Sequence, residues 1–105
     1  MKATTDQTFE ADVLAADQPV IVKFEGSWCQ PCKAMQPFLD EIEAQMPNVT
    51  FYKADVEQTT NFAVQHGILQ LPVLLAAKAG KVVGIKHGAA PKAQLESWIK
   101  SALAL

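Results

Sequence analysis

The segment GSWCQPCKAMQPF, residues 26–38, contains the only two cysteines of the chain, Cys29 and Cys32. The pair directly follows PVIVKFE, residues 19–25, which has the β-branched composition of a strand buried in a parallel sheet. Apolar side chains after the pair recur at helical spacing, with polar side chains opposite, at Met35, Leu39, Ile42 and Met46. We therefore expect Cys29 at the N-terminus of a helix and Cys32 one turn inside it.

A cysteine pair with this spacing can hold a metal ion, form a structural disulfide or act as a reversible redox switch. A bridge across so short a loop restricts the unfolded chain very little, and cytosolic thiols are mostly kept reduced. A zinc or iron–sulfur site needs three or four ligands, whereas the chain adds only His66 and His87, without paired spacing. We interpret both histidines as surface or helix-end residues, expect no metal, and favour the redox switch.

The rest of the chain alternates between helical and strand patterns. Phe9, Val13 and Leu14 mark the apolar face of a first helix, and NVTFYKADV, residues 48–56, predicts a second strand. A short helix is expected at residues 60–66, ended by Gly67.

A third strand is expected from Val73, followed by the turn KAGK at residues 78–81 and the strand VVGIKH at residues 82–87. Pro91 opens a last helix with one apolar stripe. The order of elements predicts one α/β domain, residues 1–105, with a mixed four-stranded central sheet and four helices on its two faces.

The charge of the chain argues against nucleic acid as a partner. Nine Lys and no Arg stand against eleven acidic residues, which gives a net charge of -2, and the lysines are scattered rather than gathered in a stripe. The N-terminal residues lack the apolar stretch of a signal peptide, and no apolar run is long enough to span a membrane. We expect a soluble, cytoplasmic monomer without a membrane partner.

Taken together, these motifs resemble the thioredoxin family from about Phe9 to Leu103. The resemblance is carried by W-C-x-P-C-K at residues 28–33, Pro37 within the helix, QLPV at residues 70–73, the glycine of KAGK, and Gly88. It implies the thioredoxin fold and a thiol–disulfide oxidoreductase that reduces protein disulfides without a bound cofactor. In this family a proline at the start of the third strand forms a cis peptide bond beside the cysteines, so Leu71–Pro72 is expected to be cis.

The helix N-terminus assigns different roles to the two cysteines. Its unpaired N–H groups and positive dipole end favour a thiolate, so Cys29 is expected to be the nucleophile and Cys32 the resolving thiol. Pro31 has no N–H and therefore removes one donor that could stabilise the Cys29 thiolate. A less stabilised thiolate means a more stable disulfide, which favours a reductant, as the resemblance also implies.

The substrate surface is expected around the cysteines, with the backbone of Leu71 free to pair with an extended client segment. Trp28 and Leu71 could instead be plain core residues. Expected partners are disulfide-containing client proteins and an electron donor similar to thioredoxin reductase. The residues expected on this surface are Trp28, Pro31, Leu71, Pro72, Gly88 and Ala89.

Lys23 departs from the family pattern, because a buried aspartate that assists proton transfer at the resolving cysteine is usual at its position. Lys53 matches a family lysine near that aspartate. Alternation along the strand places Lys23 and Glu25 on one face and Val22 and Phe24 on the other. Lys23 either points toward the cysteines, as a modulator of the thiolate or a proton relay, or reaches the sheet edge and pairs with Glu25.

Two further departures bear on recognition. Glu25 replaces a family aromatic, and Gln30 replaces a family glycine. Both changes are expected to affect recognition by the usual thioredoxin reductase and the redox potential of the cysteine pair. A redox-inert or partner-binding module of the same fold is an alternative, although both cysteines and Pro72 are kept. A glutaredoxin-like or isomerase variant is another, although the Trp28 and Lys33 frame resembles thioredoxin more closely.

Overall fold

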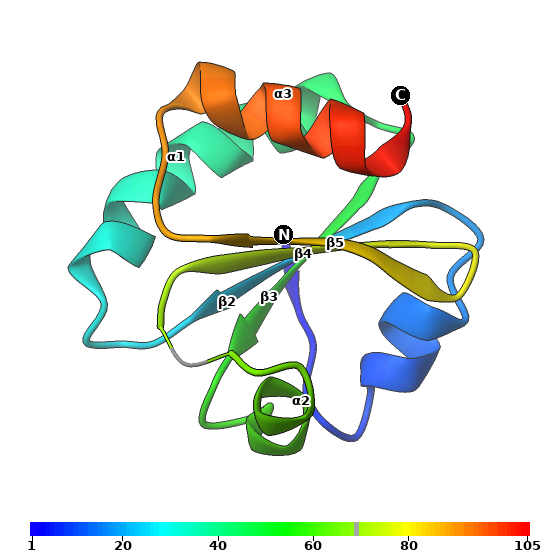
Figure 1. The fold of residues 1–105 in the computed structure, drawn as a ribbon, viewed down its shortest axis with the longest axis vertical. Coiled ribbons are helices and arrows are strands. Elements are labelled where there is room, and N and C mark those ends of the chain that lie inside the picture. Colours follow the sequence, from blue (N-terminus) through cyan, green and yellow to red (C-terminus); the bar gives the residue numbers. More distant parts are fainter. Residues whose placement is uncertain (69) are drawn as a thin grey trace.

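The computed structural model describes residues 1–68 and 70–105, which build a five-stranded sheet with helices on both faces (Figure 1). In chain order the elements are β1 (Lys2–Ala3), the short π-helix η1 (Glu10–Leu14), β2 (Val20–Glu25), α1 (Gln30–Gln45), β3 (Thr50–Asp55), α2 (Thr60–Gln65), β4 (Val73–Lys78), β5 (Lys81–His87) and α3 (Lys92–Leu103). None of the helices in these ranges is long and apolar enough to cross a membrane.

The strand order is β1-β3-β2-β4-β5, in which β1, β3 and β2 are parallel and β4 runs antiparallel to both of its neighbours. The predicted mixed sheet and the β4–β5 hairpin are confirmed. The predicted number of four strands is wrong, because Lys2 and Ala3 pair with Tyr52 and Lys53 as a fifth strand. Two residues are too few to show the alternation by which a strand is recognised in a sequence.

Helices cover both faces of the sheet (Figure 1). Helices α1 and α3 bury one face, where Ile21 packs with Leu39, Leu74 and Ile99. The opposite face packs against η1 and α2, and its core includes Val13, Val20, Val22, Phe24, Ala63, Val73 and Leu75. Alternation along β2 therefore directs Val22 and Phe24 toward one layer and Lys23 toward the other, as predicted, and Ile21 lies on the same side as Lys23.

The first helix differs from its expected pattern. Phe9 and Val13 are buried, but Leu14 is 36% exposed. The N–H of Ala15 donates to the carbonyl of Glu10, the i to i+5 bond of a π-helix, whose wider turn shifts successive side chains around the axis. The prediction that Leu14 lies on the buried apolar face of this helix is therefore wrong.

The hairpin between β4 and β5 closes with a two-residue turn. Ala79 and Gly80 have φ of 54° and 79°, so both central residues adopt the left-handed conformation of a type I′ turn. Glycine tolerates this conformation at no steric cost, which explains the turn composition of KAGK. At the opposite end of the hairpin, Pro72 directly precedes β4 and Gly88 directly follows β5.

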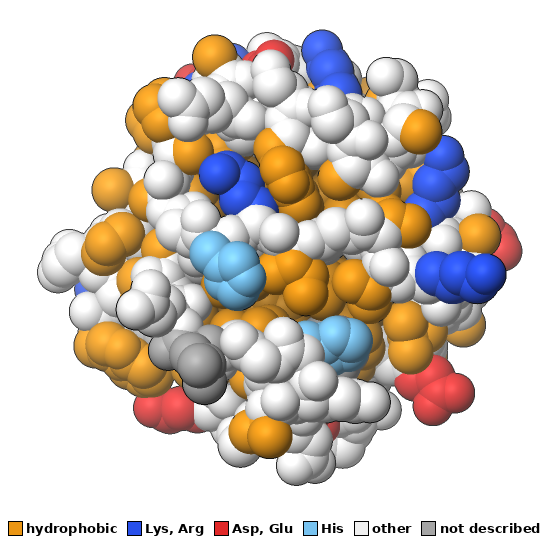
Figure 2. Space-filling view, viewed as in Figure 1, with side chains coloured by type: hydrophobic (Ala, Val, Ile, Leu, Met, Phe, Trp, Pro, Cys, Tyr) orange, Lys and Arg blue, Asp and Glu red, His pale blue; other side chains and the backbone are white. Residues whose placement is uncertain are grey.

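On the face viewed in Figure 2, hydrophobic and histidine side chains occupy much of the middle, and lysines lie near the centre, at the top and at the right edge without forming a continuous band. The described residues of this face therefore carry no basic stripe of the kind that follows a nucleic-acid backbone.

Candidate active site

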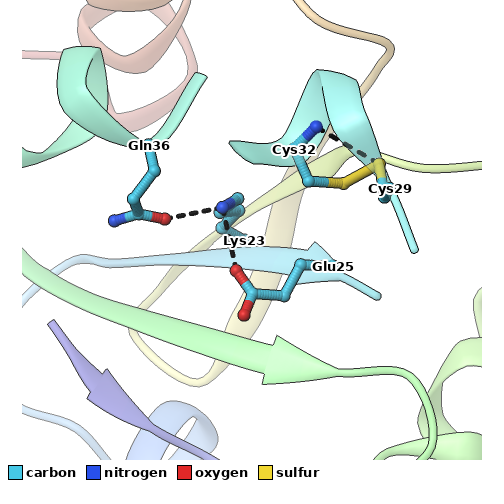
Figure 3. Close-up of a disulfide and its surroundings, with 5 residues drawn as sticks. All are labelled: Lys23, Glu25, Cys29, Cys32 and Gln36. Atoms are coloured by element: carbon cyan, nitrogen blue, oxygen red, sulfur yellow. Dashed lines mark hydrogen bonds and ion pairs between the residues drawn. A yellow bond between two sulfur atoms is a disulfide. The ribbon is translucent and has the colours of Figure 1, made fainter. Parts of the chain in front are cut away.

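Cys29 and Cys32 form a disulfide at the N-terminus of α1 (Figure 3). Cys29 is the N-cap residue in extended conformation, and its Sγ accepts a hydrogen bond from the backbone N–H of Cys32 at 3.2 Å. Cys29 is 7% exposed and Cys32 1%. Both cysteines are thus largely buried, and Cys29 is the more exposed of the two, with its sulfur held by the helix N-terminus.

The local sequence explains why α1 begins at this point. The chain leaves β2 at Glu25 and turns, and the N–H of Cys29 donates to the carbonyl of Gly26 at 3.1 Å. Pro31 occupies the first turn of α1, where its missing N–H breaks no helical hydrogen bond. The first N–H after Pro31 is that of Cys32, which is the group that reaches Sγ of Cys29.

A groove of about 500 Å³ borders Cys29 on the side of α2. The indole of Trp28 is 61% exposed on its rim, so the alternative of Trp28 as a core residue is wrong. Leu71 is half-buried and lines the same groove. The remaining lining residues are Gln30, Pro31, Val56, Ala63 and Ile68. Val56, Ala63 and Ile68 were not predicted, because nothing in the sequence distinguishes them from ordinary core positions.

The predicted proline loop lies next to this groove. The Leu71–Pro72 peptide bond is cis, as expected. The carbonyl of Pro72 accepts a hydrogen bond from the N–H of Gly88 at 2.9 Å, and Gly88 has φ of 86°, a conformation that favours glycine. Because Leu71 lines the groove together with Cys29, the site joins segments that are distant in sequence.

A second groove, of about 380 Å³, lies on the other side of Pro31. Exposed Ala89 and Phe38 are part of its almost entirely apolar lining. The other residues along it are Ala34, Met35, Ala90 and Pro91. Apolar surface therefore flanks the disulfide on both sides.

The histidines lie away from these two grooves. His66 follows α2 and is half-buried, and this burial lowers its pKa below the ordinary value. His87 ends β5 and is exposed. Within residues 1–68 and 70–105, no three His, Cys, Asp or Glu side chains are grouped as metal ligands.

Lys23 is buried on β2 beneath α1 (Figure 3). Its Nζ forms an ion pair with Oε1 of Glu25 at 2.8 Å and donates to Oε1 of Gln36 at 2.6 Å. Nε2 of Gln36 in turn donates to Oδ1 of Asp40 at 2.7 Å. The predicted pairing with Glu25 is confirmed, but the expected reach to the sheet edge is wrong, since β2 is the middle strand.

Gln36 is a site residue that the sequence analysis missed. It lies four residues after Cys32, so both side chains lie on the same face of α1. That spacing was the available signal, but a glutamine on an amphipathic helix is ordinarily a solvated residue. Its role depends on Lys23, which belongs to another element.

A family profile described as Thioredoxin matches residues 1–101. This chain belongs to the thioredoxin family. It is therefore a thiol–disulfide oxidoreductase, a protein-disulfide reductase that acts through a reversible Cys29–Cys32 pair. The expected fold, family and activity are confirmed.

Individual thioredoxins match over nearly their whole length. The chain is 43% identical over 97 residues to thioredoxin C-2 of Corynebacterium nephridii, covering 91% of this chain and 90% of that protein. It is 38% identical over 95 residues to a thioredoxin of Streptomyces clavuligerus, covering 90% and 89%. The oxidised form of mitochondrial thioredoxin 3 from Saccharomyces cerevisiae is similar in structure, with a TM-score of 0.87 and 29% identity. The match covers 96% of this chain and 94% of that one.

Proposed function

We propose that Cys29 attacks the disulfide of a client protein and that Cys32 resolves the resulting mixed disulfide. The observation that supports this order is the difference between the two sulfurs. Cys29, the N-cap of α1, is 7% exposed, borders the groove next to Trp28 and accepts an N–H at 3.2 Å, whereas Cys32 is only 1% exposed. A hydrogen bond and a helix N-terminus both favour a thiolate at Cys29.

The two steps transfer two electrons to the client. The Cys29 thiolate attacks one client sulfur, the client S–S bond breaks, and the other client sulfur leaves as a thiolate that takes up a proton. Cys32 then loses its proton and attacks Sγ of Cys29, which forms the intramolecular disulfide and expels the second client sulfur. A reductase-like protein returns two electrons to the pair.

Pro31 supports a role as reductant. It supplies no N–H to Cys29, so the thiolate gains fewer hydrogen bonds than a helix N-terminus can offer. A thiolate that is less stabilised leaves the disulfide form relatively more stable, and the dithiol then gives up electrons more readily. A role as reductant suits a reducing compartment, so we place the protein in the cytoplasm. We propose that it acts there as a monomer.

Clients are proposed to bind as extended segments across the apolar surface on both sides of Pro31. The exposed indole of Trp28 and the Leu71–Pro72 segment border one groove, and Ala89 borders the other, next to Gly88. Apolar grooves with few charged groups accept many client sequences, since they impose few specific polar contacts. Gln30 lines the first groove and there adds a polar contact for a partner.

The order of attack is tested by Cys32→Ser. Without the resolving thiol, the mixed disulfide between Cys29 and the client cannot be released, so a covalent complex is expected to accumulate. Non-reducing gel electrophoresis and mass spectrometry after mixing the reduced variant with a disulfide-bonded protein measure this complex. Release by dithiothreitol is the control. No covalent complex with Cys32→Ser, or accumulation of the complex with Cys29→Ser instead, would contradict the proposed order.

Gly26→Ala tests the contribution of Trp28 to client binding. A Cβ atom at residue 26 would lie 2.8 Å from the indole, so the exposed ring must move. We expect kcat/KM for a protein disulfide to fall about five- to tenfold, as is typical when an interface tryptophan is displaced. Ser27→Ala, at the exposed neighbouring residue, is the matched control. Unchanged kcat/KM together with altered indole fluorescence would exclude Trp28 from the client surface.

A further inference from the structure

The buried ammonium of Lys23 is a charged group that the exchange steps above do not use. Its side chain is 3% exposed, whereas that of its partner Glu25 is 27% exposed. A buried charge is costly unless it is paired and hydrogen-bonded, and Lys23 has one carboxylate and one amide oxygen as partners. These contacts hold its Nζ at one place beneath α1.

That place adjoins Cys32. Lys23 and Cys32 line the same cavity of about 380 Å³, between β2 and α1. Figure 3 shows Lys23 on the strand below the helix, with Gln36 on one side of its amine and the disulfide on the other. The other charged side chains that line the cavity are Glu25, Lys33, Asp40 and Lys53. Met1 also lines it, and its N-terminal ammonium is paired with Glu43 at 3.2 Å.

The charges around this cavity are not screened equally. Lys33, Asp40 and Lys53 are exposed, so water weakens their fields at Cys32. Glu25 is partly exposed, whereas Lys23 is almost completely removed from water. Because a buried charge acts through a lower effective dielectric, the net field of this network at Cys32 is expected to be positive.

We propose that the Lys23 ammonium, positioned by Glu25 and Gln36, stabilises the thiolate of Cys32 and thereby speeds resolution of the mixed disulfide. This inference rests on the proposed role of Cys32 as the resolving thiol. The proton of the Cys32 thiol passes to water, the Cys32 thiolate attacks Sγ of Cys29, and the client thiolate leaves. Lys23 is therefore a positioning charge rather than a proton relay.

The test measures titration of Cys32 and the rate of resolution in the same set of variants. Cys32 is titrated by thiolate absorbance in a Cys29→Ala background, where it is the only thiol. The resolution rate is followed from pH 5 to 9 with Cys29 linked to glutathione. For Lys23→Met we expect the midpoint of the Cys32 titration to rise by about one pH unit, and resolution near neutral pH to slow about tenfold.

The other variants separate a field effect from a loss of structure. Glu25→Gln removes the partner anion but leaves the cation, so the midpoint is expected to move downward. Damage to the fold would not shift the midpoint of the Cys32 titration in opposite directions in Lys23→Met and Glu25→Gln. Lys23→Arg keeps the charge and is expected to retain a midpoint close to the native one. Lys53→Met, at the exposed register neighbour of Lys23, is the matched control and is expected to shift the midpoint by less than about 0.3 units.

Two results would overturn the inference. One is a midpoint of the Cys32 titration in Lys23→Met that equals that of the native protein. The other is an upward shift of this midpoint, with slower resolution, in Glu25→Gln, which would mean that Glu25 accepts the proton of the Cys32 thiol. Both leave the order of attack intact, because Cys32→Ser traps the client whatever Lys23 does. Failure of that trap would instead contradict the proposed function.

Discussion

Cys29→Ser is expected to abolish disulfide reduction, with a rate at least about a thousandfold below that of the native protein. A serine hydroxyl remains protonated near neutral pH, so the helix N-terminus has no thiolate to stabilise. Cys32 is not expected to take over, since it is only 1% exposed, less than Cys29. The measurement is reduction of insulin by dithiothreitol, followed by turbidity, with the uncatalysed rate subtracted.

The variant pair makes this result specific. Cys29→Ser and Cys32→Ser each remove one sulfur and leave a single cysteine, so loss of the internal disulfide is common to both. Only Cys32→Ser is expected to accumulate the covalent client complex. Turnover of Cys29→Ser within tenfold of the native rate would show that Cys32 can attack clients directly, and the assigned order would be wrong.

Phe24→Ala is expected to lower the free energy of unfolding by about 3–5 kcal/mol. Phe24 is fully buried on β2, in the core between the sheet and the helices η1 and α2. Its register neighbours on β3 and β4, Ala54 and Val73, are also fully buried, and a small side chain such as Ala54 cannot expand into the space. The loss is a large share of the roughly 5–15 kcal/mol typical of a small domain.

Urea unfolding of the oxidised proteins, followed by far-UV circular dichroism, measures this loss. Phe38→Ala is the matched control, because Phe38 is 38% exposed on α1 and its truncation is expected to cost less than about 1 kcal/mol. Equal losses for the two variants would mean that the core on the η1 and α2 side contributes no more to stability than a surface groove. That outcome would contradict the packing described for β2.

Particular residues show where sequence reasoning succeeded and where it failed. The helix start at Cys29, the two faces of β2, the hairpin and the cis bond before Pro72 were predicted, since each follows from local spacing, turn chemistry or a motif. The strand at Lys2–Ala3 was missed because its only signal is its pairing partner. Leu14 was wrongly expected in the core because a π-helix and an α-helix share the same short apolar pattern.

The sequence alone determined the fold, the family and the pair of cysteines that exchange electrons, because these depend on patterns within short segments. Only the tertiary structure decided how the pair is surrounded. Trp28 lies exposed on a groove completed by α2, and Lys23 is enclosed between Glu25 and Gln36 beneath Cys32. Burial and electrostatic field depend on which distant segments meet, and a short stretch of sequence does not contain that information.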